Sequence, residues 1–219
     1  MRRIRIAAAV VAVAYIAVQG FQDFVYRTLP VPETPAEELL QGAAPLHLVR
    51  STLMLFAMLG LVFIYTTIAL QRLRARPLLA SVAIAGFGVF GLLEIALRSV
   101  ELFWTQVQLP AAYLANPDPG ILDRLATFQA VQGALYFPLM LATWIGSVAL
   151  YVLFAPPPRI HWVLRAALAL NLVRITARML TTFAGIPLLP TAIYEQIYIG
   201  LVLAFYVPVT YWLLRVDDT

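Results

Sequence analysis

Three ionisable side chains lie close together in a segment that is otherwise apolar. Glu94, Arg98 and Glu101 fall within the run FGVFGLLEIALRSVELFW, which covers residues 87–104. Their spacing of i, i+4 and i+7 places them on one face of an α-helix. Placing such a charge at the centre of a membrane helix costs roughly 2.5–3.5 kcal/mol, so these side chains are expected to face a partner or a wet cavity. They could pair with other charges, bind a ligand or, at a glutamate, act as a general acid or base.

Polar side chains interrupt the other apolar stretches in a similar way. Counted from the ends of the stretches at about 1.5 Å per residue, most of them fall in one layer, in the outer third of a hydrocarbon core about 30 Å thick, and Arg174 lies one turn deeper. Within each stretch they repeat at helical spacing and so share a face. The sequence therefore predicts a polar, outward-opening pocket between helices, lined by Gln19, Glu94, Arg98, Glu101, Gln129, Gln132, Arg174, Arg178, Glu195 and Tyr198.

Charge matching suggests how this pocket is organised. Glu94 and Glu101 are available to pair with Arg174 and Arg178, because a guanidinium binds a carboxylate through two hydrogen bonds. Two interpretations follow. In the first, the pairs only hold two helices in register; in the second, at least one arginine is left for an anionic or carbonyl-bearing ligand.

The composition indicates a membrane protein. Of the 219 residues, 62% are hydrophobic and 12% are charged, whereas about 25% of the residues of a soluble domain are charged. There is no cysteine, which excludes disulfides, thiolate catalysis, iron–sulfur clusters and Cys-ligated zinc. The net charge is +4, but the basic residues form no continuous stripe, so no nucleic-acid partner is expected.

Six apolar stretches each contain the roughly 20 residues that cross a bilayer. Segments rich in proline, glycine or arginine separate them. The sequence predicts an all-α polytopic membrane protein, a single domain with six transmembrane helices at approximately residues 4–26, 48–70, 78–104, 125–154, 162–184 and 192–214. Residues 106–124 contain Pro110 and the run NPDPG and are expected to form a turn. Residues 29–46 are expected to form a loop with a short surface turn near residues 37–41.

The arginines indicate the orientation of the chain, because short loops rich in Lys and Arg stay cytoplasmic. With the N-terminus inside, most arginines flanking the stretches fall on the inner side, and the outer side keeps only Arg27, Arg50 and Arg124. Both termini are then cytoplasmic, in a membrane of the bacterial plasma (inner) type. Residues 1–18 also have the pattern of a secretory signal peptide, but apolar character continues beyond Gln19, which favours an uncleaved first helix.

Few residues suit a metal or cofactor. His47 and His161 are assigned to opposite sides of the membrane, so they cannot share a metal or a haem. Gly86, Gly88 and Gly91 lie in an apolar helix rather than after a strand, which favours close helix packing over phosphate binding. We expect no metal and no cofactor. The expected partners are membrane lipid, a small amphiphilic ligand and another membrane protein.

The predicted topology is similar to that of the substrate-binding subunits of energy-coupling-factor vitamin transporters. The shared features are six helices, both ends inside, a site beneath outer loops, and a first helix with a small-residue face that includes Ala8 and Ala12. The resemblance covers the whole chain but is one of topology, with no ligand-binding motif. It implies a membrane subunit that binds or helps to transport a ligand.

Three functions are compatible with these features. The first, which we favour, is a binding or transport subunit that holds a small or amphiphilic ligand in the outer pocket. The second is a membrane-embedded enzyme acting on a lipid or isoprenoid, with Glu94, Glu101 or Glu195 as general acid or base. The third is a non-catalytic scaffold subunit of a membrane complex, in which the buried charges only support packing.

Overall fold

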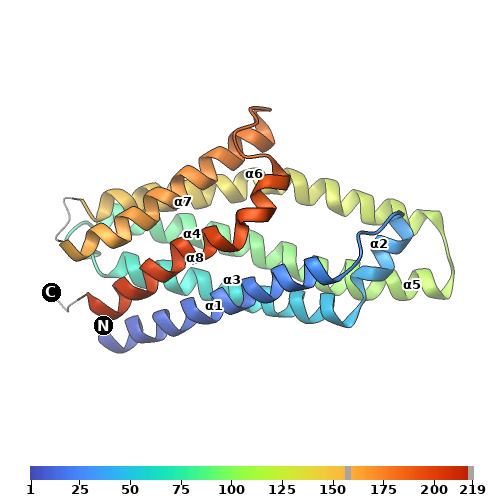
Figure 1. The fold of residues 1–219 in the computed structure, drawn as a ribbon, viewed down its shortest axis with the longest axis horizontal. Helices are drawn as coiled ribbons and strands as arrows, with labels where there is room; N and C mark the ends of the chain where they lie inside the picture. The colour runs from blue at the N-terminus through green and yellow to red at the C-terminus, as the bar shows by residue number, and fades with distance from the viewer. Residues whose placement is uncertain (156–158, 217–219) are drawn as a thin grey trace.

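The computed structural model describes residues 1–155 and 159–216, and all regular secondary structure in these ranges is helical. Its elements are α1 (Arg2–Thr28), α2 (Pro35–Gly42), α3 (Pro45–Leu70), α4 (Pro77–Val100), the π-helix η1 (Glu101–Gln108), α5 (Leu109–Ala115), α6 (Pro119–Leu153), α7 (Arg159–Phe183) and α8 (Thr191–Arg215), as Figure 1 shows. The predicted all-α fold is thereby confirmed.

Within residues 1–155 and 159–216, five helical segments are long and apolar enough to cross a membrane. They are α1, α3, the continuous rod of α4, η1 and α5, then α6, and α8. This arrangement is typical of a multi-pass membrane protein. The remaining long helix, α7, has 25 residues and is therefore about 37 Å long.

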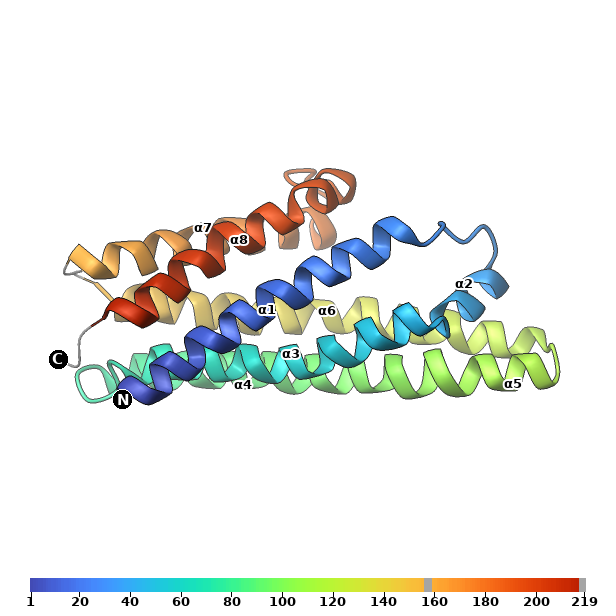
Figure 2. The ribbon, with the colours of Figure 1, turned by 60° about the horizontal axis from the view of Figure 1, so that its bottom comes forward.

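The six long helices form a closed ring. Along the chain, α1 packs on α3, α3 on α4, α4 on α6, α6 on α7 and α7 on α8, and α8 returns to pack on α1. The start of α1 and the end of α8 lie at the same end of the ring, here called the terminal end (Figures 1 and 2). Each helix contributes to one apolar core, with buried side chains that include Ala8, Ile64, Phe87, Leu150, Leu164 and Trp212.

Close packing of α4 on α6 depends on glycine. A Cβ atom built on Gly86 would lie 2.8 Å from the carbonyl oxygen of Ala142 and 2.9 Å from the amide nitrogen of Gly146. A Cβ on Gly91 would collide with the side chain of Val62 on α3. One on Gly88 would meet nothing within 4 Å. The packing role predicted for the three glycines is therefore correct for Gly86 and Gly91 and wrong for Gly88.

The third predicted span is longer than the sequence suggested. The helix continues through η1 and α5 to Ala115, beyond the predicted end at Trp104. Pro110 follows the π-helix η1 and does not end the rod. Proline lacks an N–H group. The wider turn of a π-helix shifts the backbone hydrogen bonds at this point, so the missing donor is tolerated. Only residues 116–118 form the predicted turn. Asp118 then caps α6 by accepting a hydrogen bond from the Gly120 amide at 2.9 Å, so the predicted start of that helix at residue 125 is too late.

A small cap lies at the end of the ring opposite the terminal end. It consists of α2, η1, α5 and the first turns of α6, and it has its own apolar cluster of Leu39, Leu109, Ile121 and Leu125. The predicted surface turn near residues 37–41 is part of α2, which begins where the Thr34 side chain accepts a hydrogen bond from the Glu37 amide. The rod of α4, η1 and α5 and helix α6 extend past the α7–α8 tip to carry this cap (Figure 2).

Candidate functional site

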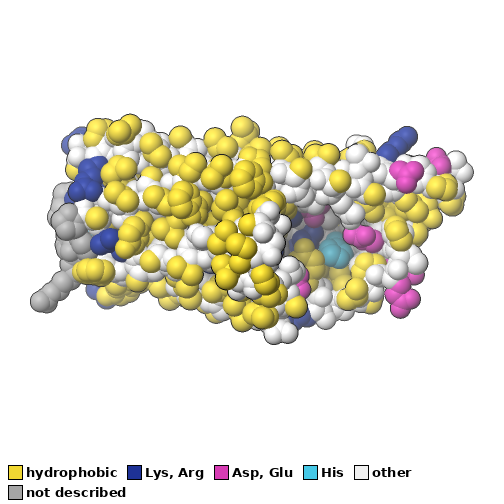
Figure 3. Space-filling view, turned by 90° about the horizontal axis from the view of Figure 1, so that it is seen from above, with side chains coloured by type: hydrophobic (Ala, Val, Ile, Leu, Met, Phe, Trp, Pro, Cys, Tyr) yellow, Lys and Arg dark blue, Asp and Glu magenta, His cyan; other side chains and the backbone are white. Residues whose placement is uncertain are grey.

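A cavity of about 1140 Å³ lies inside the ring, and we call it the ring cavity. Side chains from all six long helices line it. Figure 3 shows the surface hollowed in the half nearer the cap, with charged side chains inside the hollow. The lining includes nine of the ten predicted site residues, namely Gln19, Glu94, Arg98, Glu101, Gln132, Arg174, Arg178, Glu195 and Tyr198. The tenth, Gln129, lines a smaller neighbouring cavity.

Arg98 lies between two carboxylates of its own helical rod. Its Nε donates to Glu94 Oε2 at 3.3 Å, and its Nη1 donates to Glu101 Oε2 at 2.7 Å. Separations of three and four residues bring side chains together on a helix, so these contacts agree with the shared face that the spacing predicts. Arg98 therefore pairs with both glutamates from within the same helical rod and leaves one negative charge for another cation.

Arg50, on α3, supplies a second cation to this cluster. Its Nη2 donates to Glu101 Oε1 at 3.0 Å and to Ser51 Oγ at 2.9 Å, and its Nη1 donates to the Tyr26 hydroxyl. The side chain is only 3% exposed. Sequence reasoning missed Arg50 because it placed the residue at the edge of an outer loop. Pro45 was the available signal, since it starts α3 and puts Arg50 inside the second helical turn.

The predicted pairing of Glu94 and Glu101 with Arg174 and Arg178 is wrong. Arg98 is within one turn of both glutamates, so it reaches them without crossing the cavity. Helix α7 packs on α6 and α8, which places its arginines on another wall of the ring. Glu94, Arg98, Glu101 and Arg50 together carry two positive and two negative charges, and we call them the balanced cluster.

Arg174 and Arg178 are held by neutral groups instead. Arg174 donates from Nε and Nη2 to Asn171 Oδ1, at 3.2 and 2.9 Å, and from Nη1 to the Tyr194 hydroxyl at 2.8 Å. Arg178 donates to Thr191 Oγ1 at 3.3 Å and lies 4.5 Å from the centre of the Tyr194 ring. Within the described ranges, no carboxylate lies within 4.0 Å of either guanidinium. The α7 wall of the cavity thus presents two positive charges.

Tyrosine hydroxyls and a buried amide line another part of the ring cavity. The Tyr198 hydroxyl donates to Gln19 Oε1 at 2.6 Å and so connects α8 to α1. The hydroxyls of Tyr65 and Tyr206 lie 3.1 Å apart. Apolar side chains from α3 and α4 complete this part of the wall, including Met54, Met58, Leu61 and Phe90. The cavity therefore offers both hydrogen-bonding groups and apolar surface. Glu195, near the start of α8, is an exposed member of the lining.

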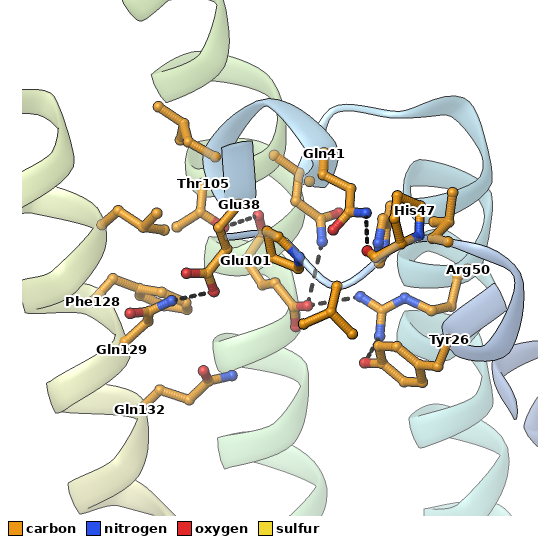
Figure 4. A pocket seen from close by; sticks show the side chains of 18 residues that line it. Tyr26, Glu38, Gln41, His47, Arg50, Glu101, Thr105, Phe128, Gln129 and Gln132 are labelled. Atoms are coloured by element: carbon orange, nitrogen blue, oxygen red, sulfur yellow. Dashed lines mark hydrogen bonds and ion pairs between the residues drawn. The ribbon is translucent and has the colours of Figure 1, made fainter. Parts of the chain in front are cut away.

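A second cavity of about 340 Å³, here called the outer cavity, lies beneath the cap. Gln129, from α6, donates to Glu38 Oε1 on α2 at 2.7 Å and so ties the cap to the ring. Figure 4 shows this bond and the side chains around it. The two cavities share Tyr26, Glu101 and Gln132 in their walls.

The histidines lie apart in the fold. His47 lines the outer cavity, whereas His161 contacts Trp212 in the core near the terminal end. In the part of the chain that the structure describes, no group of three or more histidine or acidic side chains could hold a metal ion.

Comparison of the chain with protein-family models, curated proteins and solved structures found no match. The similarity to the substrate-binding subunits of vitamin transporters stays a prediction from the sequence, because no comparison supports it. The small-residue face that contributes to it, with Ala8 and Ala12, is fully buried inside the ring.

Proposed function

We propose that the protein is a membrane-embedded binding or transport subunit that holds a small amphiphilic ligand with an anionic group in the ring cavity. One observation carries the proposal: Arg174 and Arg178 line the cavity with only neutral partners. The two glutamates expected to neutralise them are bound by Arg98 and Arg50 instead. A guanidinium held in this way is suited to bind a carboxylate or phosphate.

The size and lining of the cavity favour an amphiphile. Small-molecule sites usually have volumes of about 300–1000 Å³, and the ring cavity has about 1140 Å³. The methionines and leucine of α3 would take the apolar part of the ligand, and the α7 arginines its anionic part.

The membrane arrangement is part of the same proposal. In it, α7 also crosses the membrane and brings the number of spans to six, both termini are cytoplasmic, and the cap lies outside a plasma-type membrane. On the face shown in Figure 3 most of the arginine side chains lie toward the terminal end, although some lie beside the acidic side chains of the cap end. This bias supports the orientation under the positive-inside rule. The cap and the mouth of the ring cavity would then face the outer side.

Binding is favoured over catalysis by the contacts of Glu101. This carboxylate accepts hydrogen bonds from Arg98, Arg50 and Gln106. A general base must be free to take a proton from its substrate, so Glu101 would first have to lose these donors. The balanced cluster instead suits a structural role, which it would also have in a scaffold protein.

Native mass spectrometry of protein extracted gently from its membrane tests this proposal. We expect an anionic amphiphile to remain bound to the wild type. Replacing Arg174 by Gln removes a charge-assisted contact and should weaken retention about ten-fold or more. Arg178→Gln should act in the same direction.

Arg165→Gln is the matched control. Arg165 is on the same helix, but its guanidinium lies over the rings of Tyr151 and Trp162, at 4.3 and 5.3 Å, and it does not line the ring cavity. The control should retain the amphiphile. Equal retention by Arg174→Gln, Arg178→Gln and the wild type would show that the α7 arginines do not bind a ligand.

A further inference from the structure

Three buried polar atoms without hydrogen-bond partners belong to side chains around the outer cavity. They are Arg50 Nε, Gln106 Oε1 and His47 Nδ1, and none has a partner among the described residues. The three side chains all line the outer cavity, and those of Arg50 and Gln106 are only 3% and 6% exposed. Buried polar groups in folded proteins are nearly always satisfied by protein, water or ligand, so a concentration of them at one cavity indicates a site.

The chemistry of two of these atoms is fixed by their surroundings. Gln106 Nε2 donates to Glu101 Oε1 at 3.3 Å. A carboxylate can only accept, so the amide nitrogen must face Glu101, and the orphaned atom is the carbonyl oxygen, an acceptor. Arg50 Nε can only donate. An occupant that satisfies both atoms must offer an acceptor to Arg50 and a donor to Gln106.

The charges around the outer cavity disfavour an anion. Arg50 is ion-paired with Glu101, and Glu38 adds a further carboxylate to the lining. This differs from the α7 wall of the ring cavity, where the guanidinium groups have only neutral partners. The aromatic rings of Tyr26 and Phe128 also line the outer cavity and provide surfaces on which a planar group can pack.

We propose that the outer cavity is a second binding site, which takes a small neutral molecule bearing a hydrogen-bond donor and an acceptor side by side, as a primary carboxamide does. On binding, the Gln106 and Arg50 side chains turn these two atoms, which are almost inaccessible in the structure, toward the cavity. The donor of the molecule then binds Gln106 Oε1, and its acceptor binds Arg50 Nε–H. The site does not depend on the ligand proposed for the ring cavity, because the two side chains that make its contacts, Arg50 and Gln106, line the outer cavity and not the ring cavity.

Nicotinamide and nicotinate form a matched pair of probes. They share a ring and a size, but the first is neutral with both a donor and an acceptor, whereas the second is an anion that only accepts. Binding to the purified full-length protein is measured by saturation-transfer NMR. We expect a signal from nicotinamide and a much weaker one from nicotinate.

Gln106→Met keeps the length of the side chain and removes its amide, so it should weaken nicotinamide binding about five-fold or more. Gln71→Met is the control, because Gln71 follows α3 at the terminal end and donates to Thr67 O; it should bind like the wild type. The proposal is overturned if nicotinamide gives no signal, if nicotinate binds as well, or if Gln106→Met binds as the wild type does. Water alone would then fill the outer cavity.

Discussion

Arg98 and Arg174 illustrate two uses of a buried cation in one cavity. Arg98 has carboxylates one turn away on either side along its own rod, and its charge is cancelled locally. Arg174 has an asparagine and a tyrosine, so its charge remains effective in the cavity. Such a difference in partners separates residues that stabilise the fold from residues able to bind a ligand.

The balanced cluster should be sensitive to loss of a single charge. Glu101→Gln leaves Arg50 and Arg98 with one carboxylate fewer, and removing one partner of a buried ion pair costs about 3–5 kcal/mol. We expect a thermal midpoint in detergent several degrees below that of the wild type. Glu33→Gln changes an exposed carboxylate in the 29–34 linker and should leave the midpoint unchanged. Equal midpoints for the two variants would argue against a stabilising cluster.

For single residues, the sequence indicated which polar side chains lie around one cavity, but it did not indicate which of them pair with each other. The spacing of Glu94, Arg98 and Glu101 predicted a shared face, and depth counting placed distant residues around a common space. Which charges pair depends on which helices are neighbours in the fold. The hydropathy pattern does not predict the order of the helices around the ring. For the same reason Arg50, which lies beside Glu101 only once α3 packs on α4, was not identified.

Among the elements, α4 and α6 approach each other at backbone atoms, at the site of Gly86. Gly86→Ala would push a methyl group against the α6 backbone at Ala142 and Gly146, and overpacking of this kind costs about 1–3 kcal/mol. Gly88→Ala lies in open space on the same helix and should stabilise it slightly, because alanine has the higher helix propensity. Thermal unfolding of both variants measures the difference. A Gly86→Ala protein as stable as Gly88→Ala would contradict the close packing of α4 on α6.

Helix boundaries were predictable where composition changes sharply and unpredictable where it does not. Proline, arginine and polar residues end α3 and start α4 within a few positions. Residues 101–115 remain apolar enough to continue a helix, and there the π-helix accommodates Pro110. The sequence alone does not reveal that η1 has a different hydrogen-bond pattern.

At the scale of the whole molecule, the ring explains why an apolar chain contains a polar interior. The apolar core occupies the half of the ring nearer the terminal end. The ring cavity lies in the other half, in which α6 continues past the tip formed by α7 and α8 (Figure 2). Packing of α8 on α1 closes the ring, whereas the half nearer the cap is hollowed on the face shown in Figure 3.

The orientation of the ring can be tested with single cysteines, because the chain has none of its own. Glu33→Cys, in the linker before α2, should react with an impermeant maleimide added to intact cells. Arg74→Cys, in the exposed turn between α3 and α4, should react only after the cells are opened. The reverse pattern would place the termini outside.

The central claim is that a water-accessible cavity lies inside this ring at membrane depth and that its α7 wall, with Arg174 and Arg178, is positively charged. Thr143 lines the cavity about 15 Å along α6 from its terminal end, and Ile145 on the same helix is 40% exposed on the outer surface of the ring. The most direct measurement compares Thr143→Cys and Ile145→Cys in membranes with anionic and cationic thiosulfonate reagents, each corrected for its rate with free cysteine. We predict that Thr143→Cys reacts, faster with the anionic reagent, and that Ile145→Cys does not. No reaction at Thr143→Cys, or equal reaction at both positions, would contradict the cavity.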